Sequence, residues 1–282
     1  MTDIYKINST DIPISSAKEV LTVLNMASKK LNVQFYVIGA LARDIMTILL
    51  GGKPYKATRD IDIAVMVSED TQYYNLIEYL LQYKQFRDDK ELPYRLYIGK
   101  NIVDILPFGE IESDERDVTI DLKKTTKLST IGLREVFKFS VRVLLDEEQE
   151  INIASLAGLC ILKLIAYSEK PAERIKDIKD VNFIIENFDS MFFNNITENH
   201  FDLLSDGWDK KLFARVLGRD MSIILNEFKV VKDKILEILD SNIKENYDSK
   251  IVQLMTGSNG TLEEKVEVLK SLRQGILDDF NG

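Results

Sequence analysis

The sequence predicts an α+β fold in which a small mixed sheet flanked by helices precedes an all-helical region. Residues 59–67, RDIDIAVMV, alternate in character as a strand with two different faces does. Residues 33–38, VQFYVI, are rich in β-branched and aromatic side chains and lead through Gly39 into a helical periodicity. From Ile153 onward the long stretches have the apolar spacing of helices, so strands and helices are expected in separate parts of the chain.

Three helices are expected in the first half of the chain. Apolar residues recur on one helical face over 16–31, over 40–50 and over 71–83. The pair Gly51–Gly52 ends the second of these helices, because glycine is a poor helix former. Gly39 lies between the strand expected over 33–38 and the helix expected over 40–50, so we expect it to form a tight turn.

The remaining strands are expected as a hairpin and two short segments. YRLYIGKNIVDILPF at 94–108 predicts two strands that pivot at Gly99–Lys100, with Pro107 ending the second strand. VTIDL at 118–122 and VRVLL at 141–145 have the composition of short strands.

A domain boundary is expected near residue 150, which gives a mixed α+β domain over 1–150 and a helical domain over 151–282. No fixed-period repeat links the helical stretches, which argues against a solenoid. Those stretches are 154–170, 174–188, 211–228, 229–243 and 263–280.

Composition limits the class of protein. At 282 residues, 45% of them hydrophobic, the chain is long enough for two globular domains. No stretch reaches about 18 uncharged apolar residues, and the first residues lack a secretory pattern, so we expect a cytoplasmic protein without a membrane segment. The single cysteine, Cys160, lies in an apolar run and is expected in the core.

The charged residues favour carboxylate chemistry. The sequence contains a single histidine, His200, which excludes a His-rich zinc site and argues against a Ser-His-Asp triad. A formal net charge of −9 argues against a broad, non-specific grip on nucleic acid, which needs many Lys and Arg side chains. Any catalysis is therefore expected to use carboxylates and a hard cation.

Three aspartates form the candidate metal site. Asp60 and Asp62 are two residues apart on the expected strand, so their carboxylates project from one face about 7 Å apart at Cα. A divalent cation relieves the repulsion between such neighbours, and oxygen ligands suit Mg²⁺. Asp104, between Val103 and Ile105 on another expected strand, adds a third carboxylate. The pattern predicts a two-metal site, and the alternative is an edge strand with a solvated acidic face.

Three segments carry a resemblance to a known family. The segments are VIGALARDI at 37–45, ATRDIDIAV at 57–65 and NIVDILPFGEI at 101–111. Together they resemble the DNA polymerase β-type nucleotidyltransferase superfamily. In that superfamily an apolar strand is followed by Gly-Ser or Gly-Gly, then by D-x-D, and then by an acidic residue on a later strand. The sequence is more similar still to bacterial nucleotidyltransferases related to the abortive-infection (AbiEii-like) toxins, in which R-x-[ST]-x-D-x-D precedes a Lys-bearing helix and K-D-x-x-D. The further matching residues are Lys56, Thr58, Lys163, Lys176, Asp177 and Asp180. The chain departs from these patterns at Ala40, where Ser or Gly is usual, and at Lys56, where Arg is common.

The resemblance implies transfer of a nucleoside monophosphate from a nucleoside triphosphate (NTP) to a hydroxyl. It implies that Asp60 and Asp62 bind two Mg²⁺ or Mn²⁺ ions, and that Asp104 binds the catalytic ion and takes the proton of the attacking hydroxyl. It also implies a set of nucleotide-binding residues, namely Gly39, Ala40, Arg43, Thr58, Lys163 and Lys176.

Several of these residues have a second interpretation. Arg43 fits a phosphate contact or a surface ion pair. The Thr58 hydroxyl fits a phosphate contact or a role in orienting the Asp60 carboxylate. Lys163, in an apolar helix, fits the nucleotide phosphates or a structural ion pair. Asp177 and Asp180 fit a solvated helix face or a place beside the active site.

The acceptor is not encoded in these motifs. The toxin-like resemblance favours a tRNA or protein acceptor, a toxin-like or phage-defence role and a cognate antitoxin, whereas the acidic composition favours a cationic small molecule such as an aminoglycoside or a lincosamide. The helical domain is expected to close one side of the nucleotide cleft. Two alternatives are a catalytically inactive nucleotide-binding or antitoxin-like partner with the same fold, and a structural interaction domain.

Overall fold

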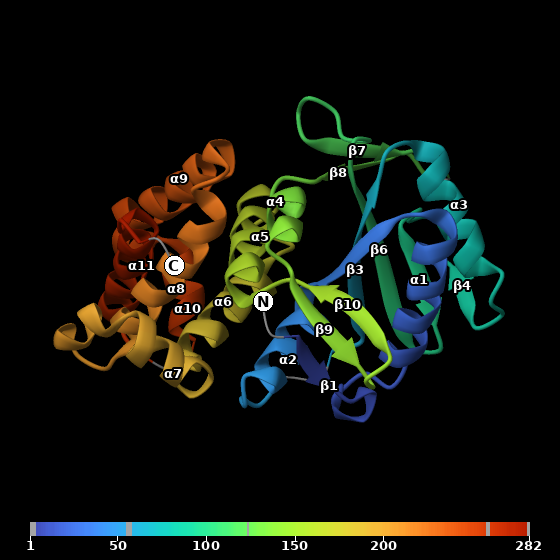
Figure 1. The fold of residues 1–282 in the computed structure, drawn as a ribbon. Helices are drawn as coiled ribbons and strands as arrows, with labels where there is room; N and C mark the ends of the chain where they lie inside the picture. The colour runs from blue at the N-terminus through green and yellow to red at the C-terminus, as the bar shows by residue number, and fades with distance from the viewer. Residues whose placement is uncertain (1–3, 55–57, 123, 258–259, 281–282) are drawn as a thin grey trace. The chain divides into compact units, whose positions relative to one another are not determined.

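The computed structural model describes residues 4–54, 58–122, 124–257 and 260–280. The chain forms two compact units, an N-terminal unit that runs to Ser155 and a C-terminal unit that begins at Leu156 and includes Leu50–Gly52. Figure 1 shows both units, coloured along the chain. Within the described residues, no helix combines the length and the apolar character that crossing a lipid bilayer requires.

An eight-stranded mixed sheet forms the centre of the N-terminal unit. Three neighbouring pairs in it are parallel and four are antiparallel. The sheet is therefore mixed, as expected, but the prediction that it is small was wrong. Its strands, in spatial order, are β1 (Tyr5–Ile7), β9 (Val141–Leu145), β10 (Gln149–Ile153), β2 (Gln34–Ile38), β3 (Asp60–Val67), β6 (Asn101–Gly109), β5 (Arg95–Ile98) and β4 (Phe86–Asp88).

Helices cover the apolar face of the sheet. Ile61, Ile63 and Val65 of β3 are fully buried, whereas Asp60 and Asp62, which alternate with them, are half-buried. The helices α1 and α3 lie side by side on one face of the sheet (Figure 1). The other elements of this unit are α2, α4 and a separate hairpin. The bounds are α1 Ala17–Leu31, α2 Gly39–Leu49, α3 Asp70–Leu81, α4 Leu133–Lys138, β7 Asp117–Ile120, β8 Thr126–Ser129 and the 3₁₀ turn Ser9–Asp11.

Helices are the only regular secondary structure among the described residues of the C-terminal unit, and turns and loops connect them. Two of these helices cross in backbone contact: a Cβ atom on Gly218 would lie 2.2 Å from the Leu272 carbonyl oxygen, and one on Gly275 would lie 2.0 Å from the Arg215 carbonyl oxygen. Only glycine allows such an approach. The bounds are α5 Leu156–Glu169, α6 Ile175–Glu186, α7 Phe188–Asn199, α8 Lys210–Leu225, α9 Lys229–Glu245, α10 Lys250–Thr256 and α11 Leu262–Leu277, with 3₁₀ turns at Phe201–Asp206 and Asn246–Asp248.

One predicted strand end was wrong. Pro107 lies inside β6, opposite Val65 of β3, and the strand continues to Gly109. The pairing of β5 with β6 stops at Arg95 opposite Asp104, so β6 has lost that neighbour before it reaches Pro107. A proline is tolerated there because its missing N–H removes no bond to β5.

Candidate active site

The strand register places the three aspartates on one face of the sheet. Asp62 of β3 lies directly opposite Asp104 of the parallel strand β6, and Asp60 lies opposite Ile102. Residues that are two apart on a strand, and residues that are paired across strands, project to the same side. Asp60, Asp62 and Asp104 therefore share one face of the sheet, opposite to the face on which Ile61, Ile63 and Val65 are buried.

Gly39 and Asp62 are in close contact. Ile38, the last residue of β2, pairs with Asp62, and α2 begins at the next residue. A Cβ atom on Gly39 would lie 2.0 Å from Asp62 Oδ2, and the φ angle of Gly39 is +67°. The start of α2 thus approaches the Asp62 carboxylate, and the positive end of a helix favours a negative charge there. Ala40, the next residue, is half-buried.

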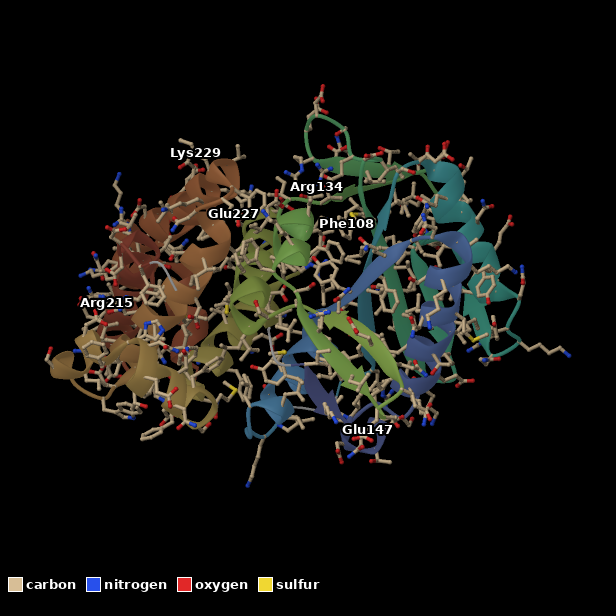
Figure 2. All side chains as sticks on the ribbon, in the orientation of Figure 1. Phe108, Arg134, Glu147, Arg215, Glu227 and Lys229 are labelled. Carbon is tan, nitrogen blue, oxygen red and sulfur yellow. The ribbon has the colours of Figure 1, made fainter. Side chains whose placement is uncertain are left out.

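An aromatic cluster bounds the same face. Phe108, labelled in Figure 2, packs against the rings of Tyr36 and Phe137, with centroid distances of 5.8 Å and 5.6 Å, and those two rings also contact each other at 5.4 Å. Tyr36 donates a hydrogen bond to the Leu133 carbonyl at the start of α4. Because Phe108 lies four residues beyond Asp104 on β6, the acidic part of the face is limited to the end of the sheet where β3 and β6 begin.

Asp104 is held by an arginine that the sequence analysis did not identify. Arg95 Nε donates to Asp104 Oδ1 and Arg95 Nη2 donates to Asp104 Oδ2, each at 2.7 Å. The Arg95 side chain is 26% exposed and that of Asp104 is 15% exposed. Hydrogen bonding to Asp104 raises the pKa of Arg95. Both oxygens of the third carboxylate are therefore engaged by one guanidinium.

The donor set fits a hard divalent cation only in part. Carboxylate oxygens are the ligands that Mg²⁺ and Mn²⁺ prefer, and Asp60 and Asp62 supply them from adjacent positions. Among the described residues, however, no three acidic, histidine or cysteine side chains gather closely enough to hold an ion. The structure thus brings the three aspartates to one face but leaves Asp104 bound to Arg95.

Thr58 contacts the backbone of the first aspartate. Its hydroxyl oxygen accepts a hydrogen bond from the Asp60 backbone N–H at 3.1 Å. This contact fixes the chain at the start of β3, so Thr58 acts on the backbone of Asp60 in this structure. Lys56, two residues earlier, lies outside the described residues.

Arg43 forms a buried ion pair. Its Nε and Nη2 atoms donate to Asp44 Oδ1 at 2.9 Å and 2.7 Å, and the two side chains are only 4% and 0% exposed. Of the two interpretations from sequence, the ion pair is present, but its expected surface position was wrong. Arg43 is buried because α2 is enclosed over residues 41–47.

Lys163 also forms a buried ion pair, in the C-terminal unit. Its ammonium group donates to Asp177 Oδ1 at 2.8 Å and to Asp180 Oδ2 at 2.6 Å. Burial lowers the pKa of Lys163, but attraction to the two carboxylates outweighs it and the net direction is upward. The structure thus contains the structural ion pair that was one interpretation of Lys163. Lys176, on the same helix as these aspartates, is exposed.

A cavity of about 520 Å³ lies elsewhere in the N-terminal unit. Arg59, which directly precedes β3, and Lys100 at the β5–β6 turn contribute the positive charges among its lining residues. The three aspartates are not among those residues, so this cavity is distinct from the acidic face. The lining consists of Ser15, Ser16, Glu19, Arg59, Gln85, Ile98, Gly99, Lys100 and Asn101.

Comparisons with known proteins give only distant likenesses. No protein-family model matches the sequence, and no curated protein matches it either. A nucleotidyltransferase-like antigen from Paracoccidioides brasiliensis is similar in structure with a TM-score of 0.39 at 16% identity, over 70% of this chain and 92% of that chain. The antibiotic-resistance factor ANT(2")-Ia, in complex with adenylyl-2"-tobramycin, has a TM-score of 0.35 at 13% identity, over 59% of this chain and 86% of that chain. A tRNA nucleotidyltransferase with a primer tRNA and an ATP analogue has a TM-score of 0.32 at 14% identity, over 90% of this chain and 82% of that chain. TM-scores this low support no conclusion about this chain.

Proposed function

We propose that the chain is a divalent-metal-dependent nucleotidyltransferase that moves a nucleoside monophosphate from an NTP to an acceptor hydroxyl. The observation that carries the proposal is the register of Asp62 opposite Asp104, with Asp60 on the same face. The contact of Asp62 with Gly39 supports it, because it puts the start of α2 beside the carboxylates, and helix N-termini bind phosphates. The sequence resemblance to polymerase β-type and AbiEii-like enzymes points to the same activity.

Each residue then has a defined task. Asp60, Asp62 and, once released from Arg95, Asp104 would hold Mg²⁺ or Mn²⁺, which would supply charge neutralisation for the triphosphate. The backbone N–H groups at Gly39 and Ala40 would face the phosphates. Thr58 would keep Asp60 in place through the backbone. These assignments use the N-terminal unit alone, and the nucleotide contacts of Lys163 and Lys176 remain predictions from the resemblance.

The acceptor class is to be found by experiment. The full chain would be incubated with each α-labelled NTP, with Mg²⁺ or Mn²⁺, and with total tRNA, cell lysate or a panel of aminoglycosides and lincosamides. Label transferred to RNA or protein would favour a toxin-like role with a cognate antitoxin, and label on a drug would favour a resistance role. Failure of every combination, together with no thermal stabilisation by metal and NTP, would contradict the proposal.

A second candidate function is a catalytically inactive nucleotide-binding or antitoxin-like partner. The bidentate contact of Arg95 with Asp104 favours it, because it occupies a carboxylate that catalysis would need. Thermal stabilisation by Mg²⁺ and NTP without any transferred label would identify this case.

A further inference from the structure

Across the acidic face, the aspartate pair and Arg95 form a row. Asp62 on β3, Asp104 on β6 and Arg95 on β5 are paired residue to residue, so they lie side by side on three adjacent strands. Asp104 is the middle member, with a carboxylate on one side and a guanidinium on the other. A cation that joined Asp62 to Asp104 would need the Asp104 oxygens that Arg95 now occupies.

The contact of Arg95 with Asp104 is strong but open to solvent. Two parallel N–H···O bonds at 2.7 Å make a charge-assisted fork, the strongest common geometry for this pair of groups. Its side chains are nevertheless 26% and 15% exposed, whereas those of the enclosed pair Arg43 and Asp44 are 4% and 0% exposed. A partly exposed arginine can leave its partner more easily than an enclosed one, so Arg95 is suited to exchange.

The guanidinium also has a natural alternative ligand. Arginine binds phosphate oxygens with the same fork that it presents to a carboxylate. A triphosphate beside Asp62 would bring several negative charges within reach of the next strands. The triphosphate would then draw Arg95 away and leave Asp104 with negative charge and no counter-ion, which is the condition in which it binds a metal ion.

We propose that Arg95 is an internal counter-ion that competes with a divalent cation for Asp104 and yields Asp104 to the metal when an NTP phosphate binds the guanidinium. The proposal rests on the proposed function, since it concerns the same site. By thermodynamic reciprocity, nucleotide and metal would each strengthen the binding of the other.

The test is metal binding by the full chain in the absence of catalysis. Free Mn²⁺ would be followed by electron paramagnetic resonance during titration of the wild type, Arg95→Gln and Arg95→Lys. The matched control is Arg87→Gln, because Arg87 is an exposed arginine on neighbouring β4 that hydrogen-bonds the Gly99 carbonyl. Without nucleotide, Arg95→Gln should bind Mn²⁺ roughly tenfold more tightly than the wild type, because a hydrogen bond between charged groups no longer competes. Arg87→Gln should match the wild type. Arg95→Lys keeps the charge but loses the fork, so its affinity should lie between those of the wild type and Arg95→Gln.

A non-hydrolysable NTP analogue completes the test. With the analogue present, the wild type should gain Mn²⁺ affinity and the difference from Arg95→Gln should shrink. Equal affinities of the wild type and Arg95→Gln without nucleotide, in a protein whose binding is lost in Asp62→Asn, would overturn the competition while leaving the proposed function intact. Failure of every variant to bind Mn²⁺, with or without the analogue, would overturn the metal-dependent function and the role of Arg95 with it.

Discussion

The carboxylate of Asp62 occupies the space that a side chain on residue 39 would need: a Cβ atom on Gly39 would lie 2.0 Å from Asp62 Oδ2 and 2.9 Å from Asp62 Cβ. Gly39 also has a φ of +67°, a conformation that residues with a Cβ atom rarely adopt. The glycine therefore does two things at once, since it turns the chain from β2 into α2 and leaves room for a candidate metal ligand.

Gly39→Ala should lower the free energy of unfolding by about 1–3 kcal/mol, from the positive φ and the clash together. A double-mutant cycle, with stability measured by denaturant unfolding, separates the cost of the clash from the cost of the positive φ angle. In an Asp62→Ala background the alanine at position 39 should cost less, because the nearest carboxylate atoms are gone. An identical cost in both backgrounds would show that the contact with Asp62 is not what requires glycine.

Asp62→Asn should reduce label transfer by at least about a hundredfold, since it removes a charge that the proposed metal site needs. The metal-free variant should be as stable as the wild type or slightly more stable, because fewer negative charges then share the face. Glu110→Gln, an exposed substitution just after β6, is the control and should leave both measurements unchanged. A variant that lost transfer only because it unfolded would count against the assignment.

Lys163→Met should destabilise the protein by about 3–5 kcal/mol, because it leaves Asp177 and Asp180 buried without their common counter-ion. Adding Asp177→Asn and Asp180→Asn should restore part of the loss in urea unfolding. Unchanged stability of the single variant would mean that the ion pairs contribute little.

Asp220 should make stability depend on pH. Burial raises its pKa to about 7 from an ordinary 3.8, so the folded protein holds a proton there that the unfolded chain releases. The resulting stabilisation is complete below pH 3.8 and is lost as the pH rises through about 7. Asp220→Asn should therefore gain stability over the wild type between pH 4 and 7, by on the order of 2–4 kcal/mol at the upper end. Denaturant unfolding at four pH values would measure the difference, and a pH-independent difference would contradict the assignment.

His200 acts in the opposite direction. Burial lowers its pKa to about 4 from 6.5, so the stability associated with the neutral ring is lost as the pH falls from 6.5 to 4. When the pH falls from 6.5 to 4, the wild type loses stability at His200 and gains stability at Asp220, so the two effects offset each other. Asp220→Asn removes the carboxylate that lies 3.9 Å from His200 Nε2, so this variant should show the His200 effect without the opposing contribution of Asp220, as a rise in stability from pH 4 to 6.5.

Gly218→Ala should lower the melting temperature, although alanine normally favours a helix by about 1 kcal/mol over glycine. Its Cβ atom would lie 2.2 Å from the Leu272 carbonyl oxygen, so α8 and α11 would have to separate. Gly275→Ala should have the same effect, and the double variant should cost less than the sum because both changes open the same crossing. A higher melting temperature in either single variant would contradict the close approach.

The elements that could be predicted from sequence are those with a long, one-sided apolar pattern. β3, α1 and α3 have that pattern, and their bounds lie within two residues of the expected ones. The three-residue strands β1 and β4 do not, because a period of two cannot be recognised over so short a run. Each of these edge strands exists because a neighbouring strand offers hydrogen bonds: β1 pairs with β9 from a distant part of the chain, and β4 pairs with β5, which follows it closely.

Some features of the candidate site could be predicted from the sequence and others could not. The common face of Asp60 and Asp62 follows from their spacing. The pairing of Arg95 with Asp104 follows from the predicted turn at Gly99–Lys100, since residues equally distant from a two-residue turn face each other. The partners of Lys163 depend on how α5 and α6 pack, which no local pattern specifies.

The order of the strands in the sheet also determines when each strand can find its partner while the chain is being synthesised. β2 pairs in parallel with β10, which follows it by more than a hundred residues. At roughly 5–20 residues per second, a ribosome needs about 5–20 seconds to make the intervening chain. During that interval one edge of an apolar strand stays without its final partner, and exposed edges of this kind invite pairing with other chains. The newly made N-terminal half is therefore most exposed to aggregation, and most dependent on chaperones, before residue 153 has left the ribosome.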